Sequence, residues 1–395
     1  MKLFQRLLVA PAALGLFSPL AANATEINLN EIANYSDVES IELANSFNND
    51  ESTRNSLLAG GEGLVDTSSY DGSFSETTTA SFSVDFAIGA LDGKGIETGV
   101  TDGDEDLQAI YGFQIDLNTS FTGEDSLDIS LDAGNAAVDG NGSQTGPLAE
   151  FDLNGGSEAL TVDGVSYTFP VGDSMTVIVG DNTDGSALFS TACVYGGPSN
   201  TLDDCANVNA GITNGGLAVG ASYDFGNGFV AAVGYAGPET GILTDESADA
   251  YGANVIYTGD NYGLSLTYGA IESGTNENTY TAFNGYYSLD NGISVSAGYE
   301  VGDLGGQTAA QDETEAYFIG INGEVGPGEL GAAIGTAGSM TEASSVMPER
   351  LMYEAYYSYP VNDGMTITPL VYVKEGSTTA DADETGMMVK TSFSF

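Results

Sequence analysis

The chain ends in the ten residues Gly386-Met387-Met388-Val389-Lys390-Thr391-Ser392-Phe393-Ser394-Phe395. Counted back from the terminus, every second residue is apolar or threonine, and those between are mostly polar. This period of two is typical of a β-strand with one apolar and one polar face. A strand that ends in an aromatic residue, with no polar tail, fits the closing strand of a membrane β-barrel. An ordinary amphipathic edge strand would alternate in the same way, so the rest of the sequence must distinguish the two.

The first residues predict export. A short basic start, Met1–Arg6, precedes an apolar run from Leu7 to Leu20, and Ala24 closes a small-x-small cleavage motif with Thr25 as the mature start. Residues 1–24 are therefore predicted to be a signal peptide. No later segment has the roughly 18 to 20 apolar residues of a membrane-spanning helix. With a barrel, this combination predicts the outer membrane of a Gram-negative-type bacterium, and Phe393 and Phe395 resemble the terminal signal that hands such barrels to their assembly machinery.

Charge narrows the function classes. The chain has 57 Asp plus Glu, 7 Lys plus Arg and no histidine. Such a balance repels anions and concentrates cations, and it excludes binding of nucleic acid through basic groups. Without histidine, Ser-His-Asp and Cys-His catalysis and His-ligated zinc sites are excluded.

Alternation organises the sequence from residue 81 to the end. Residues 25–80 are polar and are predicted to be a periplasmic linker or remnant N-terminal segment, and 81–395 the barrel. Seven short turns interleave with eight long loops, including 181–216 and 271–278, as in barrels with short periplasmic turns and long external loops. The sequence predicts an all-β, transmembrane antiparallel β-barrel of about 16 strands, with 14 to 18 as the range. The predicted strands are 81–88, 107–117, 126–132, 160–169, 174–180, 217–225, 229–235, 249–258, 262–270, 279–289, 293–301, 314–322, 329–336, 351–359, 365–374 and 386–395.

Short motifs then suggest a family. The signal peptide, Asn118–Asp125 and Tyr167–Asp173 resemble segments of cyanobacterial outer-membrane porins, whose barrels are similar to carbohydrate-selective porins. The resemblance implies a homotrimer and passage of inorganic ions. Members usually carry an S-layer-homology domain before the barrel. Here only Tyr35-Ser36-Asp37-Val38 echoes it, so the domain is expected to be reduced or absent.

Strand parity predicts the site. Carboxylates on the polar face are expected to line the pore and favour cations, opposed by Lys374 and Lys390. Cys193 and Cys205 are expected to form a disulfide in the third long loop, since the exported chain meets an oxidising compartment. By analogy with general porins, this loop is the candidate constriction, and a stapled external loop is the alternative. The predicted pore-lining acids are Asp85, Asp116, Asp128, Asp132, Asp224, Glu300 and Glu354, and the constriction candidates are Asp181, Asp184, Asp203 and Asp204.

These features predict a passive, cation-preferring diffusion channel for small hydrophilic solutes and inorganic ions, with lipopolysaccharide, outer-membrane lipid and the assembly machinery as further partners. No cofactor is expected. No dedicated metal site is expected either, because the acidic runs 102–106 and 381–384 do not complete a calcium-loop pattern. The first alternative is an acidic surface-exposed structural or adhesin-like β-protein without an open pore. A barrel enzyme is the second, and no residue pair supports it.

Overall fold

A computed structural model of the chain describes residues 77–92, 107–136, 148–153, 158–213, 216–240, 242, 244, 248–273, 276–307, 312–341, 349–376 and 383–395. Within these ranges the chain forms sixteen β-strands and one short 3-10 helix, η4 (Ala149–Phe151). The predicted signal peptide and residues 25–76 lie outside the described residues. The strands are β1 (Thr78–Asp92), β2 (Gln108–Thr119), β3 (Ser126–Gly134), β4 (Thr161–Val171), β5 (Met175–Asp181), β6 (Leu217–Gly226), β7 (Phe229–Gly237), β8 (Ala250–Thr258), β9 (Tyr262–Ser273), β10 (Asn276–Ser288), β11 (Ile293–Leu304), β12 (Glu313–Val325), β13 (Gly328–Thr336), β14 (Leu351–Asn362), β15 (Met365–Lys374) and β16 (Glu384–Ser394).

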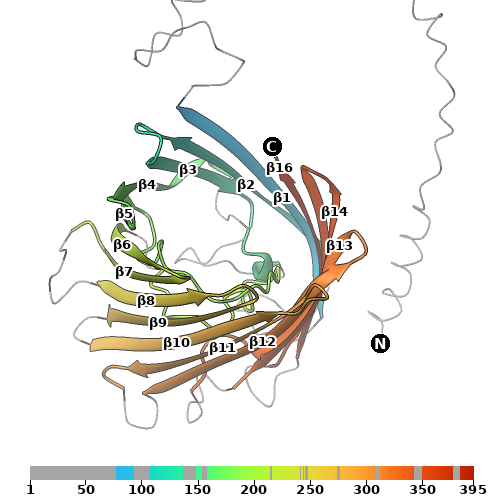
Figure 1. The fold of residues 1–395 in the computed structure, drawn as a ribbon. Coiled ribbons are helices and arrows are strands. Elements are labelled where there is room, and N and C mark those ends of the chain that lie inside the picture. Colours follow the sequence, from blue (N-terminus) through green and yellow to red (C-terminus); the bar gives the residue numbers. More distant parts are fainter. Residues whose placement is uncertain are drawn as a thin grey trace, which may run out of the picture. The chain divides into compact units, whose positions relative to one another are not determined.

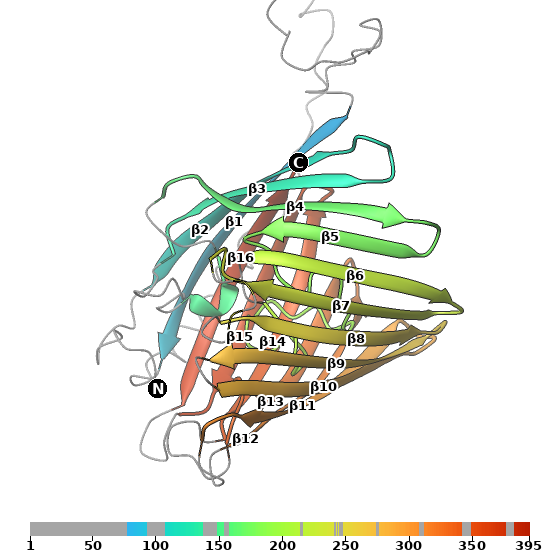
Figure 2. The ribbon, with the colours of Figure 1, turned by 90° about the vertical axis from the view of Figure 1, so that its left-hand side faces the viewer.

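The strands close into one antiparallel barrel (Figures 1 and 2). Each strand pairs with its neighbours in sequence, and β1 pairs with β16 in a register that runs from Ser83 opposite Ser394 to Asp92 opposite Thr385. The C-terminal residues therefore form the closing strand. At this seam the ring of Phe395 stacks on Phe82, with 5.6 Å between the ring centroids. The predicted all-β barrel of 16 strands is confirmed.

Alternation gives the barrel an apolar outer face. On β12, Ile319 and Ile321 are 59% and 47% exposed, whereas Phe318 between the outward residues Tyr317 and Ile319 is 1% exposed. The other strands place valine, leucine, tyrosine and phenylalanine on the same outward face. Water would oppose so wide an exposed apolar surface, and lipid accepts it. The outer face is thus suited to a bilayer.

Short and long connections alternate except between β9 and β10, and two boundaries differ from the predicted ones. Seven short connections join β2 to β3, β4 to β5 and so on to β14 and β15. The first strand begins at Thr78, three residues before the predicted boundary at 81. The long loop predicted over 271–278 is wrong, because β9 extends to Ser273 and β10 begins at Asn276. The alternation continues through Glu272 and Glu277, which pair across the two strands, so the hairpin is longer than the apolar residues indicated.

In the part of the chain that the structure describes, no helix is long and apolar enough to cross a bilayer.

Part of the inward face is apolar. The sequence had predicted polar side chains on this face of the strands. Inward residues of β12, β14, β15 and β16, among them Phe318, Met352, Leu370 and Met388, are each 1% exposed or less. They pack against residues from two connections that enter the barrel. The interior is therefore packed with apolar side chains on the side of these four strands.

Candidate functional site

The connection between β5 and β6 lies inside the barrel, where Figure 1 shows it as a green trace within the ring of strands. Its residues 182–213 are called the inner loop below. Polar side chains that point inward from successive strands bind its backbone, so the loop follows the inner wall from β8 to β12. These hydrogen bonds are Ser190 N to Asn254 Oδ1 (3.1 Å), Ala192 N to Ser265 Oγ (2.9 Å), Val194 N to Ser296 Oγ (3.1 Å), Asn284 Nδ2 to Cys205 O (2.7 Å) and Asn322 Nδ2 to Val194 O (3.2 Å).

Two glutamates fasten the inner loop more firmly. Glu300 Oε2 on β11 accepts the backbone amides of Asn209 and Ala210, each at 2.8 Å. Glu354 on β14 accepts the hydroxyl of Tyr195 at 2.6 Å. Hydrogen bonds to a carboxylate are stronger than neutral ones, so these contacts are the principal anchors.

The anchoring role corrects part of the predicted pore lining. Glu300 and Glu354 do point inward, as strand parity predicted, but they are 1% and 4% exposed. The inner loop covers both, so neither faces lumen water. Strand parity reports the side of the wall and cannot report whether another segment covers it.

Glycines on the wall let the loop approach. A Cβ built on Gly298 of β11 would lie 1.8 Å from the carbonyl oxygen of Cys205, and one on Gly234 of β7 would lie 1.8 Å from that of Gly185. No side chain fits in either space, so glycine is required where the loop backbone contacts the strand. Cys193 and Cys205 are joined by a disulfide within the inner loop, with 6.5 Å between their Cα atoms.

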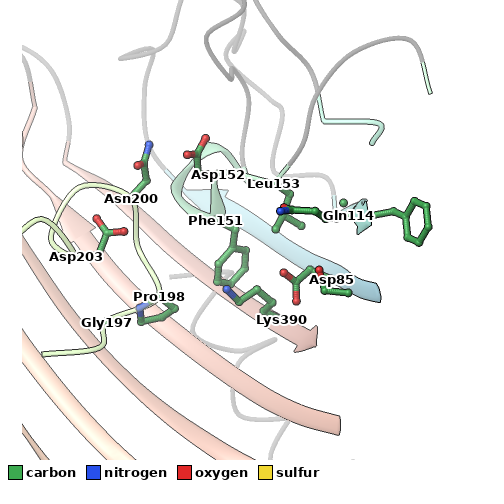
Figure 3. A pocket seen from close by; sticks show the side chains of 13 residues that line it. Asp85, Gln114, Phe151, Asp152, Leu153, Gly197, Pro198, Asn200, Asp203 and Lys390 are labelled. Atoms are coloured by element: carbon green, nitrogen blue, oxygen red, sulfur yellow. The ribbon is translucent and has the colours of Figure 1, made fainter. Parts of the chain in front are cut away.

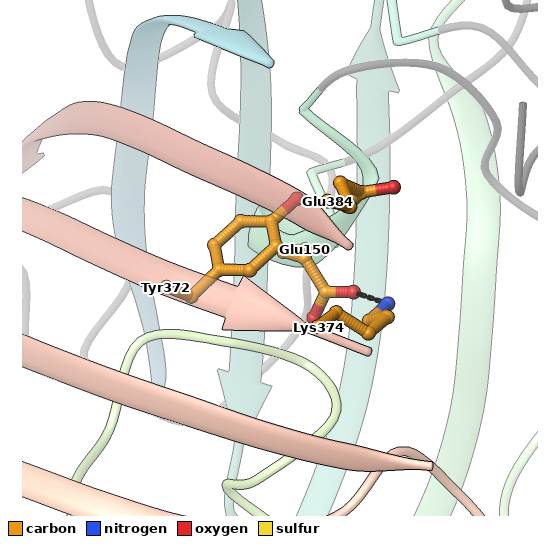
Figure 4. Close-up of polar contacts among 4 residues, drawn as sticks. All are labelled: Glu150, Tyr372, Lys374 and Glu384. Atoms are coloured by element: carbon orange, nitrogen blue, oxygen red, sulfur yellow. Dashed lines mark hydrogen bonds and ion pairs between the residues drawn. The ribbon is translucent and has the colours of Figure 1, made fainter. Parts of the chain in front are cut away.

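A second segment, which was not predicted from the sequence, also enters the barrel. Residues 148–153, called the lumen segment, include η4 and lie between the inner loop and strands β15, β16 and β1. Lys374 at the end of β15 forms an ion pair with Glu150, and both side chains are nearly buried, at 11% and 8% exposed (Figure 4). Nearby, the hydroxyl of Tyr372 donates to Glu384 at 2.5 Å. The backbone amide of Asn200 donates to the carbonyl of Glu150 at 2.8 Å, which joins the lumen segment to the inner loop.

A cavity of about 350 Å³ remains between these two segments and the barrel wall (Figure 3). Asp85 of β1, Gln114 of β2 and Lys390 of β16 reach it from the wall. The lumen segment supplies Phe151, Asp152 and Leu153, and the inner loop supplies Gly197, Pro198, Asn200 and Asp203. The side chains that meet here come from strands and loops far apart in the sequence.

The wall beside the cavity carries the predicted acids of β1, β2 and β3. Asp85, Asp116, Asp128 and Asp132 are all partly exposed. The last three accept hydrogen bonds from neutral side chains. These donors include Ser130 Oγ to Asp116 at 2.8 Å, Asn118 Nδ2 to Asp128 at 2.6 Å and Thr161 Oγ1 to Asp132 at 2.8 Å. Neutral donors fix the direction of a carboxylate and leave its charge in place. This wall can therefore present negative charge to the lumen.

The remaining predicted acids lie in different places. Asp203 lines the cavity, and Asp204 follows it in the inner loop. Asp181 is opposite Val165 in the β4–β5 register, which puts it on the outward face, so its prediction as a constriction residue is wrong. Asp184 is exposed near the start of the inner loop. Asp224 is exposed beside the β6–β7 turn, where it accepts the amide of Gly226 at 2.7 Å.

Asp203 and Asp204 titrate unusually. Both residues are partly open to solvent, and Asp203 lines the cavity, but the surrounding wall and loops withdraw water from the two carboxylates. This raises the pKa of Asp203 to about 6 and that of Asp204 to about 7. Neighbouring acids add to the rise: Asp152 and Glu150 raise the pKa of Asp203, and Asp203, Glu300 and Asp152 raise that of Asp204. Within the described ranges, no group of three or more His, Cys, Asp or Glu residues is arranged to hold a metal ion.

Comparison with known proteins relates the fold to solved barrels. No family model matches the sequence, and no curated protein matches it. Among solved structures, OprB of Pseudomonas putida at high pH aligns with a TM-score of 0.60 at 12% identity, over 81% of this chain and 94% of that one. A substituted Rh. blastica porin aligns with a TM-score of 0.54 at 13% identity, over 80% and 100% of the two chains. A loop-deletion mutant of OmpT, an outer membrane protein of Vibrio cholerae, gives 0.55 at 12% identity, over 81% and 100%. At these identities the likeness establishes the shared barrel fold alone.

Proposed function

We propose that the chain is a porin, a passive diffusion channel of a bacterial outer membrane that carries small hydrophilic solutes and inorganic ions and prefers cations. The observation that carries the proposal is the division of the inner face. The inner loop covers the wall from β8 to β14, while Asp85, Asp116, Asp128 and Asp132 remain on the wall of β1–β3. A narrowed lumen bordered by uncompensated carboxylates concentrates cations without a binding pocket.

The apolar outer band and the likeness to porin folds support membrane residence. The excess of 57 acidic over 7 basic residues in the whole chain supports the cation preference. The proposal includes assembly as a homotrimer, contact with outer-membrane lipid and lipopolysaccharide, and recognition of Phe393 and Phe395 by the assembly machinery. It assigns the chain no catalytic step.

The test is planar-bilayer conductance of the refolded mature chain under a KCl gradient. We expect stepwise conductance with a reversal potential directed towards the cation equilibrium. Replacement of the four wall acids by asparagine (D85N, D116N, D128N, D132N) should lower the potassium-to-chloride permeability ratio several-fold.

A matched control removes four charges outside the lumen. Glu124, Asp173, Asp260 and Asp290 are exposed in short turns, and E124Q, D173N, D260N and D290N together change the net charge by the same amount. This control should keep the cation preference. Equal losses in both variants would show that total charge, and not the wall, sets selectivity. A folded barrel without conductance would overturn the channel and favour a structural or adhesin-like protein.

A further inference from the structure

The cavity beside Lys390 combines charges of both signs. Three carboxylates line it, from Asp85, Asp152 and Asp203, and Lys390 is the one basic residue of its lining. Asp85 is opposite Ser392 and Ala87 is opposite Lys390, so Asp85 and Lys390 are diagonal neighbours on adjacent strands, both directed inward. Such diagonal neighbours lie roughly 7 to 8 Å apart along the wall.

These opposite charges do not neutralise each other. Among the described residues, the ion pair of the barrel joins Lys374 to Glu150, and Lys390 forms none. The Lys390 amine instead lies over the ring of Phe151, 5.7 Å from its centroid (Figure 3). A cation at this distance from an aromatic ring is held by the ring's quadrupole and keeps its charge. Lys390 therefore remains available to an anionic group in the cavity.

We propose that this cavity is an affinity subsite for small zwitterions, solutes that carry an ammonium and a carboxylate a few bonds apart, such as short amino acids. The solute carboxylate binds Lys390, and its ammonium binds Asp85 on the wall or Asp203 on the inner loop. Leu153 and Pro198 border the cavity and accept the methylene groups between the two charges. The proposal rests on the open channel proposed above and names the solute class that the channel retains longest.

Other solute classes fit the lining less well. A simple anion meets three carboxylates for one amine. A simple cation is attracted by the excess of carboxylates but leaves Lys390 without an anionic partner. A neutral polyol can form hydrogen bonds with these groups but places no charge against either of the two signs. The cavity volume of about 350 Å³ is at the lower end of the roughly 300–1,000 Å³ usual for small-molecule sites. A small zwitterion alone places each of its charged ends against an opposite charge.

The test measures single-channel potassium current while glycine or 4-aminobutyrate is added, with glycolamide as the neutral isomer of glycine. We expect a saturable decrease of current with the zwitterions and none with glycolamide. Replacement of Lys390 by methionine (K390M) should weaken the apparent affinity at least about tenfold, because a charge-assisted hydrogen bond is lost. The K390R variant should keep the affinity, and D85N should weaken it.

Each result decides the matter. If glycine and glycolamide act alike, or if K390M retains the block, the zwitterion subsite is wrong while the channel stands. If no variant conducts, the proposed function fails, and calorimetric titration of glycine into the detergent-folded barrel tests the subsite alone. Glycine heat that is absent in K390M and present in K390R supports the subsite, and its absence from the wild type overturns it.

Discussion

Removal of the Lys374 amine should release the Glu150 end of the lumen segment from the barrel wall. The ion pair with Glu150 is nearly buried, with 11% and 8% of the two side chains exposed. The Oε2 atom of Glu150 already has no hydrogen-bond partner among the described residues. In the K374M variant, Glu150 would be a buried charge without compensation, which costs roughly 3 to 5 kcal/mol.

That cost exceeds the remaining polar anchor of Glu150. The apolar contacts of Leu148, Phe151 and Leu153, each 5% exposed or less, hold the rest of the segment, so only its Glu150 end is expected to leave the wall. The hydrogen bond from Asn200 to the carbonyl of Glu150 is worth about 1 kcal/mol. The barrel ladder does not include residues 148–153, so the strands should stay closed while Glu150 moves into water. We therefore expect K374M to form a folded, heat-modifiable barrel with a larger single-channel conductance than the wild type.

A double variant tests whether the uncompensated charge of Glu150, and not the altered side chain at position 374, causes the change in conductance. Replacement of both partners by methionine (E150M with K374M) removes the uncompensated charge, and a buried ion pair replaced by apolar residues of similar volume is often neutral in stability. The double variant should return conductance towards the wild-type value. Equal conductance in the wild type and K374M, with both barrels shown to be folded, would refute the argument that this ion pair holds the lumen segment in the pore.

Three further predictions concern the loop, the pH response and a turn. The pKa of Asp203 is raised to about 6 and that of Asp204 to about 7, so both side chains become negatively charged as the pH rises from about 5 to 8. The potassium-to-chloride permeability ratio, measured from reversal potentials, should therefore increase over this range. The double variant D203N with D204N should show a smaller increase. Replacement of Glu300 by alanine leaves two loop amides without their acceptor, and we expect faster proteolysis of the inner loop than in a variant that keeps an acceptor, E300Q. Hydrogen bonds from Tyr167, Thr122 and Ser120 lower the pKa of Asp125. The ionised carboxylate therefore stabilises the β2–β3 turn above its unfolded-state pKa, and this contribution to stability is lost as the pH falls. Hydrogen exchange of this turn should depend less on acid pH in the D125N variant.

Sequence alternation was sufficient for the wall and insufficient for what lies inside it. A strand that meets lipid on one face and the interior on the other must alternate, so the strands were predictable to within a few residues. The inward direction of Glu300 and Glu354 follows from the same alternation. Their burial does not, because it depends on a loop that joins other strands. The lumen segment gave no local signal, since η4 is only three residues long and Glu150 pairs with Lys374, 224 positions away.

The two halves of the inner wall nevertheless differ in residue type, and the physics of burial explains the difference. Where the inner loop covers the wall, most of its acceptors and donors are uncharged, as at Asn254, Ser265 and Ser296, each 2% exposed or less. A hydroxyl or amide is buried at little cost once it is hydrogen-bonded, whereas a buried carboxylate needs several strong donors. Glu300 receives three from the inner loop, two from Asn209 and one from Ala210. Asp116 and Asp128, which have neutral hydrogen-bond donors, lie on the wall that no described segment covers. Aspartates that are held only by neutral donors need water to stay charged, so the residues to which the proposed cation preference is assigned also require a hydrated lumen on this side of the barrel.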